Sequence, residues 1–110
     1  MIRRGWEEAA SEYAQDRLGI FQRSGGRLLE LLRPPPGSRL LDIGTGTGAV
    51  ALQAGDWVGP EGRVTGSDVA MAMVSLAEQA ATELGITDIA FYRMDAEELD
   101  FPDASFDTAT

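Results

Sequence analysis

The segment LLDIGTGTGAVAL, at residues 40–52, limits the fold of this 110-residue chain more than any other stretch. It begins with an apolar run that is too short for a helix and that ends in an acid, Asp42. Three glycines then alternate with other residues, and an apolar helical pattern runs over residues 47–58. This order predicts a buried strand at 39–43, a tight turn of bare backbone, and a helix packed behind the strand.

The same alternation of strand and helix continues along the chain. The pattern predicts further strands at 63–68, 89–94 and 106–110, a helix at 70–85, and a short helical turn and loop at 95–105. Strands that alternate with helices of this length indicate right-handed crossovers and a parallel sheet. The predicted fold class is therefore α/β, with a Rossmann-like parallel sheet of strands 1–4 and flanking helices.

Two predicted helices carry the apolar residues that would pack on this sheet. The first begins at residue 20 and has an apolar stripe that consists of Leu28, Leu29, Leu31 and Leu32. Three prolines at 34–36 end it, and Gly25 and Gly26 predict an earlier break. The helix at 70–85 ends at Gly85 and buries one predicted face, made of Met73, Leu76, Ala77, Ala80 and Leu84.

The composition excludes several kinds of site. The chain has no cysteine and no histidine, so it has no disulfides, thiolate nucleophiles, or metal sites of thiolate or imidazole, and no metal site is predicted. The net charge of −9 argues against binding to nucleic acid or to anionic membranes. No stretch reaches the ~20 apolar residues of a membrane span, and the first residues lack the apolar core of a secretory signal. The predicted location is cytoplasmic.

The charge is also unevenly distributed along the chain. Residues 1–39 carry seven arginines and five acids, a net of +2, whereas residues 40–110 carry two arginines and thirteen acids, a net of −11. An acidic half suits a cationic ligand, and the alternative is an ordinary solvated acidic surface.

Ligands of parallel α/β sheets bind beyond the carboxyl ends of the strands, where the three glycines of this chain follow the first strand. Gly44, Gly46 and Gly48 lack a Cβ, so a ligand can lie against the backbone, and the helix after them directs free N–H groups to the same place. The spacing departs from the dinucleotide pattern Gly-x-Gly-x-x-Gly, because the third glycine comes one residue early. A carboxylate at position 42 would repel a pyrophosphate and attract an ammonium or sulfonium group. No Gly-Lys-Ser/Thr follows the glycines, which excludes a Walker loop.

The glycine segment resembles motif I of class I S-adenosylmethionine-dependent methyltransferases, which is an acid-x-Gly-x-Gly-x-Gly pattern at the end of the first strand. Residues 64–78 resemble the second motif of that family, and residues 91–107 resemble its third motif. The lead-in at 9–48 is most similar to the methyltransferases of ubiquinone and menaquinone biosynthesis. The resemblance covers nearly all of residues 6–110. It implies S-adenosyl-L-methionine as cofactor and an unidentified small-molecule methyl acceptor.

The resemblance gives cofactor roles to the ends of the first two strands. Asp68 would hold both ribose hydroxyls, since a carboxylate accepts through two oxygens, and the alternative is a turn acid or helix cap before Ala70. Asp42 would lie near the amino group of the cofactor, or would instead cap the glycine turn. The glycines would let the methionine part and the ribose lie on the backbone, or would simply make a tight turn. Thr45 and Thr47 would bond either the cofactor or the turn itself.

The resemblance also implies an adenine site. Asp95 would accept a hydrogen bond from the adenine amine, with the backbone of Ala96 beside the ring, and the alternative for Asp95 is an N-cap. Val69 and Met71 would enclose the adenine ring, or would belong to the core.

Residues 1–38 are expected to form an N-terminal helical cap, and residues 39–110 the N-terminal part of a cofactor-binding core. In the cap, Tyr13 and Phe21 would cover the site or pack between helices. The family domain has three further strands, so the chain is expected to be a fragment whose fourth strand is exposed and open to self-association. No catalytic base is predicted. The alternative functions are a cofactor-binding fragment without activity and an NAD-binding oxidoreductase.

Overall fold

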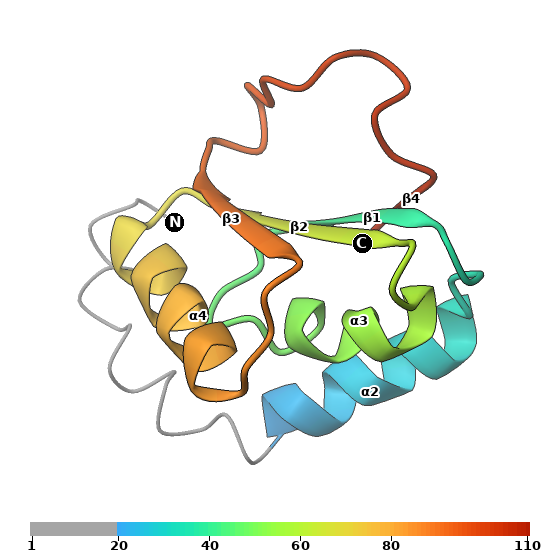
Figure 1. Ribbon diagram of the computed structural model, residues 1–110. Helices are drawn as coiled ribbons and strands as arrows, with labels where there is room; N and C mark the ends of the chain where they lie inside the picture. The colour runs from blue at the N-terminus through green and yellow to red at the C-terminus, as the bar shows by residue number, and fades with distance from the viewer. Residues whose placement is uncertain (1–19) are drawn as a thin grey trace.

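The computed structural model describes residues 20–110 and arranges them in two layers (Figure 1). One layer is a parallel four-stranded sheet with the strand order β3-β2-β1-β4. The other layer contains the described helices α2, α3 and α4, which lie on one face of the sheet (Figure 1). The predicted fold class, a Rossmann-like parallel sheet with flanking helices, is confirmed.

The strands lie where the alternating pattern predicts them. The elements are α2 (Ile20–Leu32), β1 (Arg39–Ile43), α3 (Ala51–Val58), β2 (Arg63–Asp68), α4 (Met71–Glu83), β3 (Ile89–Arg93) and β4 (Thr108–Ala109). The last strand is short and pairs with β1 at an edge of the sheet, where Thr108 lies opposite Leu40. An ion pair supports this edge, because Arg39 Nη2 lies 3.0 Å from Asp107 Oδ1.

The core lies between the sheet and the helices. Leu40 of β1, Val64 of β2 and Phe91 of β3 are at most 8% exposed and belong to one cluster with the helices. The helices contribute mostly small side chains to this cluster: Ala51, Ala54, Val58, Val74, Ala77 and Ala81. Small residues let α3 and α4 lie close to the strands, and the burial of apolar area stabilises this arrangement by about 25 cal/mol per Å².

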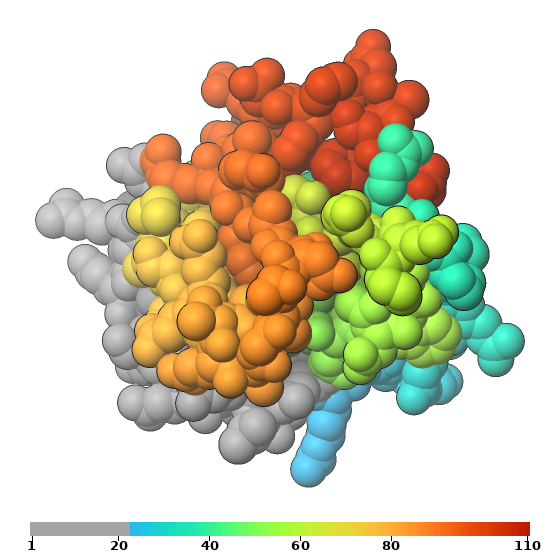
Figure 2. Space-filling view, in the orientation of Figure 1, coloured from blue at the N-terminus to red at the C-terminus, as the bar shows by residue number. Residues whose placement is uncertain are grey.

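The segment 94–107 crosses the side of the sheet opposite the helices (Figure 1). Its Phe101 packs edge-on against Tyr92 of β3, with the ring centroids 6.0 Å apart, and against Phe106 at 5.0 Å. In the space-filling view the segment forms a projecting ridge at the top of the molecule (Figure 2). Residues 95–105 consist of short turns at 96–97 and 103–104 joined by irregular chain, and the Glu98 N–H donates to the Asp95 carbonyl at 2.9 Å, in agreement with the predicted short turn and loop.

The leucine stripe and the helix break predicted for the first helix are both wrong. Leu29 is fully buried, but Leu28, Leu31 and Leu32 are 40%, 68% and 37% exposed, so the four leucines do not form one buried face. Gly25 and Gly26 lie inside an unbroken helix. A Cβ on Gly25 would lie 2.9 Å from the Ala49 carbonyl oxygen, so this glycine permits close packing of the helix against residue 49.

Two other helix predictions need correction. The predicted helix at 47–58 begins only at Ala51, because Gly46 and Gly48 have φ values of +57° and +92° in turns that a helix cannot contain. The buried face of α4 consists of Met73, Val74, Ala77 and Ala81. Leu84 lies beyond the helix and is 67% exposed, contrary to the prediction, whereas Gly85 ends the helix as expected with a φ of +73°.

The predicted division at residue 38 stays a prediction. Residues 1–19, and Tyr13 with them, lie outside the described residues, and α2 contacts α3 of the predicted core. Phe21 lies in α2, but its side chain also falls outside the described part. Within residues 20–110, no helix has the length and apolar character required to span a membrane.

Candidate functional site

The carboxyl ends of the parallel strands bring several predicted residues to one edge of the sheet. The turn after β1, residues 44–48 and here called the glycine loop, lies beside the end of β2, since the Thr45 N–H donates to the Ser67 carbonyl at 2.7 Å. Asp68 ends β2, and Asp95 follows β3 two residues after its end. We call the glycine loop together with Asp42, Asp68 and Asp95 the strand-end site.

The glycine loop has a backbone that favours glycine. Gly44, Gly46 and Gly48 have φ values of +69°, +57° and +92°, a region that other residues rarely adopt. A Cβ on Gly44 or Gly46 would meet no atom within 4 Å, whereas one on Gly48 would lie 3.0 Å from the side chain of Leu52. The first two glycines therefore leave open space beside the backbone, and the third also allows the loop to pack on α3.

Asp68 joins the glycine loop to the end of β2. Its Oδ2 accepts the Gly46 N–H and its Oδ1 accepts the Ala70 N–H, each at 2.9 Å. The bond to Ala70 is the turn-acid role that the sequence offered as an alternative, while the bond to Gly46 was not predicted. A carboxylate has about four acceptor positions, so these two bonds leave room for two more donors.

Asp42 is a buried carboxylate, only 5% exposed, at the end of β1. Its Oδ2 accepts the hydroxyl of Thr45 and its Oδ1 accepts the hydroxyl of Thr110, both at 2.8 Å. Burial raises the pKa of Asp42 above its usual range, the two hydroxyl bonds lower it, and the charge of Asp68 raises it further. Asp42 thus caps the glycine loop, which is one of the two roles that the sequence predicts for it. The Thr45 hydroxyl of the loop is the donor of this cap.

The four residues predicted around adenine lie at the ends of β2 and β3. Asp95 is exposed, and its Oδ1 accepts the Glu97 N–H at 2.9 Å. Ala96 is exposed beside it, Val69 is half-buried, and Met71 is 44% exposed at the start of α4. Neither Val69 nor Met71 is a core residue, so both side chains are accessible near the strand ends.

Sequence reasoning missed two residues of this region. A Cβ on Gly66 of β2 would lie 2.8 Å from Thr45 Oγ1 and 2.7 Å from Phe91 Cδ1, so the strand needs a glycine there. A glycine inside a predicted strand is a recognised sign of such a close approach. Thr110 had no signal in the sequence, because its role depends on the pairing of β4 with β1.

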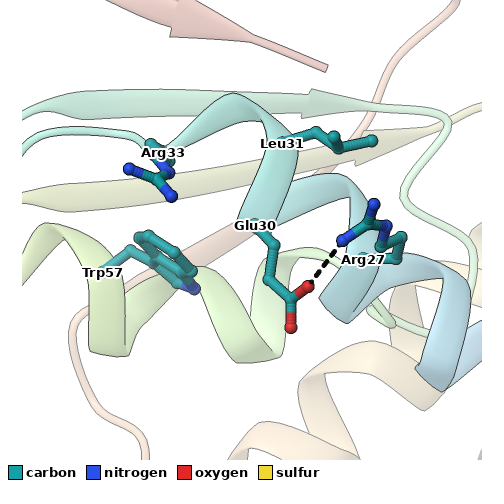
Figure 3. Close-up of a pocket in the computed structure, with 5 residues that line it drawn as sticks. All are labelled: Arg27, Glu30, Leu31, Arg33 and Trp57. Atoms are coloured by element: carbon teal, nitrogen blue, oxygen red, sulfur yellow. Dashed lines mark hydrogen bonds and ion pairs between the residues drawn. The ribbon is translucent and has the colours of Figure 1, made fainter.

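A hollow of about 520 Å³ lies on the helical layer between α2 and α3 (Figure 3). It is lined by Arg27, Glu30, Leu31, Arg33 and Trp57. Arg27 Nη1 lies 3.1 Å from Glu30 Oε2 in an exposed ion pair on one wall. Arg33 directly follows α2, and Trp57 is in the last turn of α3, whose Val58 carbonyl accepts the Gly37 N–H just before β1. The hollow therefore lies toward the amino ends of the strands, away from the strand-end site.

Comparison with known proteins identifies the family. The family model described as "Methyltransferase domain" matches residues 40–110. The chain is 41% identical over 108 residues to aklanonic acid methyltransferase DauC of Streptomyces sp. (strain C5), which covers 96% of this chain and 48% of that relative. It is 36% identical over 83 residues to the ubiquinone/menaquinone biosynthesis C-methyltransferase UbiE of Pseudomonas savastanoi pv. phaseolicola, covering 74% of this chain and 32% of that relative. The chain thus spans about half or less of the length of these relatives.

A solved structure agrees with this match. The crystal structure of a SAM-dependent methyltransferase from Aquifex aeolicus superposes with a TM-score of 0.77 at 25% identity, covering 91% of this chain and 54% of that one. The resemblance predicted from the sequence is confirmed, and it favours a methyltransferase over the NAD-binding alternative. The chain belongs to the methyltransferase domain family.

Proposed function

We propose that the chain binds S-adenosyl-L-methionine at the strand-end site, as part of an enzyme that methylates a small-molecule acceptor. The observation that carries the proposal is the pairing of an open glycine loop with carboxylates from two adjacent strands. Space is open beside Gly44 and Gly46, and Asp42 and Asp68 both hydrogen-bond to the loop. These acidic groups suit a ligand with a sulfonium and an ammonium group.

The residues present fit such a cofactor. The remaining acceptor positions of Asp68 would take the two ribose hydroxyls. Asp42 would act on the amino group through its charge, since its two oxygens already accept hydroxyls. The open backbone of the glycine loop would lie against the methionine part and the ribose. Asp95 and the Ala96 backbone would meet the adenine edge, with Val69 and Met71 beside the ring.

The chain's contribution to methyl transfer would be binding, orientation and exclusion of water. The cofactor, when bound, supplies a methyl carbon that its sulfonium already makes electrophilic. The protein therefore has to hold the acceptor in line with that carbon, and orientation of this kind supplies much of an enzyme's acceleration. We assign no general base among the described residues.

The acceptor class follows from the relatives. Their names give aklanonic acid and ubiquinone or menaquinone biosynthesis, which concern small organic molecules, and this supports a small-molecule acceptor here. The net charge of −9 supports an acceptor other than nucleic acid. A cytoplasmic location and self-association through β4 stay predictions.

A thermal-shift experiment tests the cofactor. At ten times its Kd, S-adenosylhomocysteine is expected to stabilise the folded chain by about 1.4 kcal/mol and so to raise the melting temperature, because a ligand that binds only the native state shifts the unfolding equilibrium. NAD at the same concentration serves as the control and is expected to leave the melting temperature unchanged. A shift with NAD, and none with S-adenosylhomocysteine up to millimolar concentration, would reject the proposal.

A further inference from the structure

Asp42 is satisfied by neutral donors. Within residues 20–110, Asp42 accepts the side-chain hydroxyls of Thr45 and Thr110, and the Ala51 N–H of α3 also stabilises its charged form. The arginines in ion pairs of this part of the chain lie elsewhere, with Glu30 and Asp107 as their partners. An ionised carboxylate that is 5% exposed depends strongly on such hydrogen bonds, since burial disfavours its charge.

Of the two threonines that donate to Asp42, Thr45 is a neighbour in sequence, whereas Thr110 is 68 residues away. Its backbone is fixed to β1 on both sides, because its N–H donates to the Leu41 carbonyl at 2.8 Å and its carbonyl accepts the Ile43 N–H at 3.0 Å. These bonds hold the hydroxyl beside Asp42 Oδ1. A line of contacts therefore runs from Thr110, directly after β4, through Asp42 and Thr45 into the glycine loop.

We propose that Thr110 is a positioning residue of the strand-end site: its hydroxyl orients the Asp42 carboxylate, and through Asp42 and Thr45 it fixes the glycine loop for the cofactor. This inference rests on the proposed function. It adds a residue that the family resemblance did not assign, and it gives β4 a part in cofactor binding without direct contact.

The same bond has a consequence for pH. Within residues 20–110, the charged group that acts on Asp42 is Asp68 of β2, which raises the pKa of Asp42. The hydroxyl of Thr110 lowers that pKa, so its loss lets Asp42 take up a proton at higher pH. A protonated Asp42 no longer attracts a cationic ligand, and the affinity is therefore expected to fall as the pH falls through the pKa of Asp42.

The experiment measures S-adenosyl-L-methionine affinity by calorimetry from pH 4.5 to 8 in the full chain. Thr110→Val is expected to weaken binding roughly threefold to tenfold, the effect of losing one ordinary hydrogen bond, and to move the midpoint of the pH profile upward. Thr110→Ser keeps the hydroxyl, and we expect it to bind with the affinity of the wild type and to have the same midpoint of the pH profile. Thr108→Val makes the same chemical change two residues earlier on β4, and we expect it to match the wild type.

A second measurement does not need the cofactor. The ¹³C carboxyl signal of Asp42, followed by NMR in the ligand-free chain, is expected to titrate at higher pH in Thr110→Val than in Thr110→Ser. If valine disrupts β4, Thr110→Ala removes the same hydroxyl with a smaller side chain. Its affinity and its Asp42 titration are then compared with those of Thr110→Ser.

The outcomes separate the two proposals. If the wild type binds no S-adenosyl-L-methionine at any pH, the proposed function fails, and the role of Thr110 fails with it. If the wild type binds while Thr110→Val and Thr108→Val agree in affinity and in the Asp42 titration, only the role of Thr110 is overturned.

Discussion

Asp68→Ala is expected to weaken the binding of S-adenosyl-L-methionine by at least about tenfold. A hydrogen bond to a charged group contributes roughly 1.5–3 kcal/mol, and the carboxylate would offer one to each ribose hydroxyl. The substitution also removes the acceptor of the Gly46 N–H and the Ala70 N–H, so the glycine loop loses its bond to the end of β2. Calorimetry gives the affinity, and denaturant unfolding gives the change in free energy of unfolding.

The matched control for this prediction is Asp100→Ala. Asp100 is an exposed acid in the segment 94–107, so its removal changes the net charge equally without touching the glycine loop. The affinity of the Asp100→Ala variant for S-adenosyl-L-methionine is expected to stay within twofold of the wild type. An Asp68→Ala variant that binds as tightly as Asp100→Ala would remove Asp68 from the site.

Gly66→Val is expected to lower the free energy of unfolding by about 3 kcal/mol, at the upper end of the usual cost of overpacking. The new Cβ would lie 2.7 Å from Phe91 Cδ1 and 2.8 Å from Thr45 Oγ1. Phe91 is in the core, and the Thr45 hydroxyl is bound to Asp42, so neither can move freely. Denaturant unfolding measures the loss, and the displaced Thr45 is expected to weaken cofactor binding as well.

Gly55→Ala is the control, and it is expected to raise the free energy of unfolding rather than lower it. Gly55 lies inside α3, and a Cβ there would meet no atom within 4 Å. Alanine is therefore expected to stabilise the fold by about 0.5–1 kcal/mol through its higher helix propensity. If Gly66→Val left the free energy of unfolding unchanged, the close approach of Thr45 to β2 would be wrong.

The predictions from sequence succeeded where neighbours along the chain decide the structure. The strands β1, β2 and β3 and the parallel sheet follow from short apolar runs that alternate with helical patterns. The turns at the strand ends follow from glycine itself, because Gly44 and Gly46 adopt φ values that other residues avoid. The acids at positions 42 and 68 belonged to the same local pattern, so the sequence could place them at the strand ends.

The predictions failed where packing decides. The periodicity of α2 marks four leucines as equivalent, yet only Leu29 meets the core, since the stripe does not specify which part of the helix touches α3. Gly25 predicts a helix break when considered alone, but its contact with Ala49 makes it a packing residue. Helix propensity is a weak preference, which tertiary contacts override.

The sequence by itself determined the order of strands and helices, the glycine conformations, and the family to which the chain belongs. Only the tertiary structure decided what surrounds each acid: the Gly46 N–H on Asp68, and the hydroxyl of Thr110 on Asp42 across 68 positions of sequence. The physical reason is that backbone preferences act between neighbours, whereas the hydrogen bond between Thr110 and Asp42 exists only after the pairing of β4 with β1 has brought distant residues together.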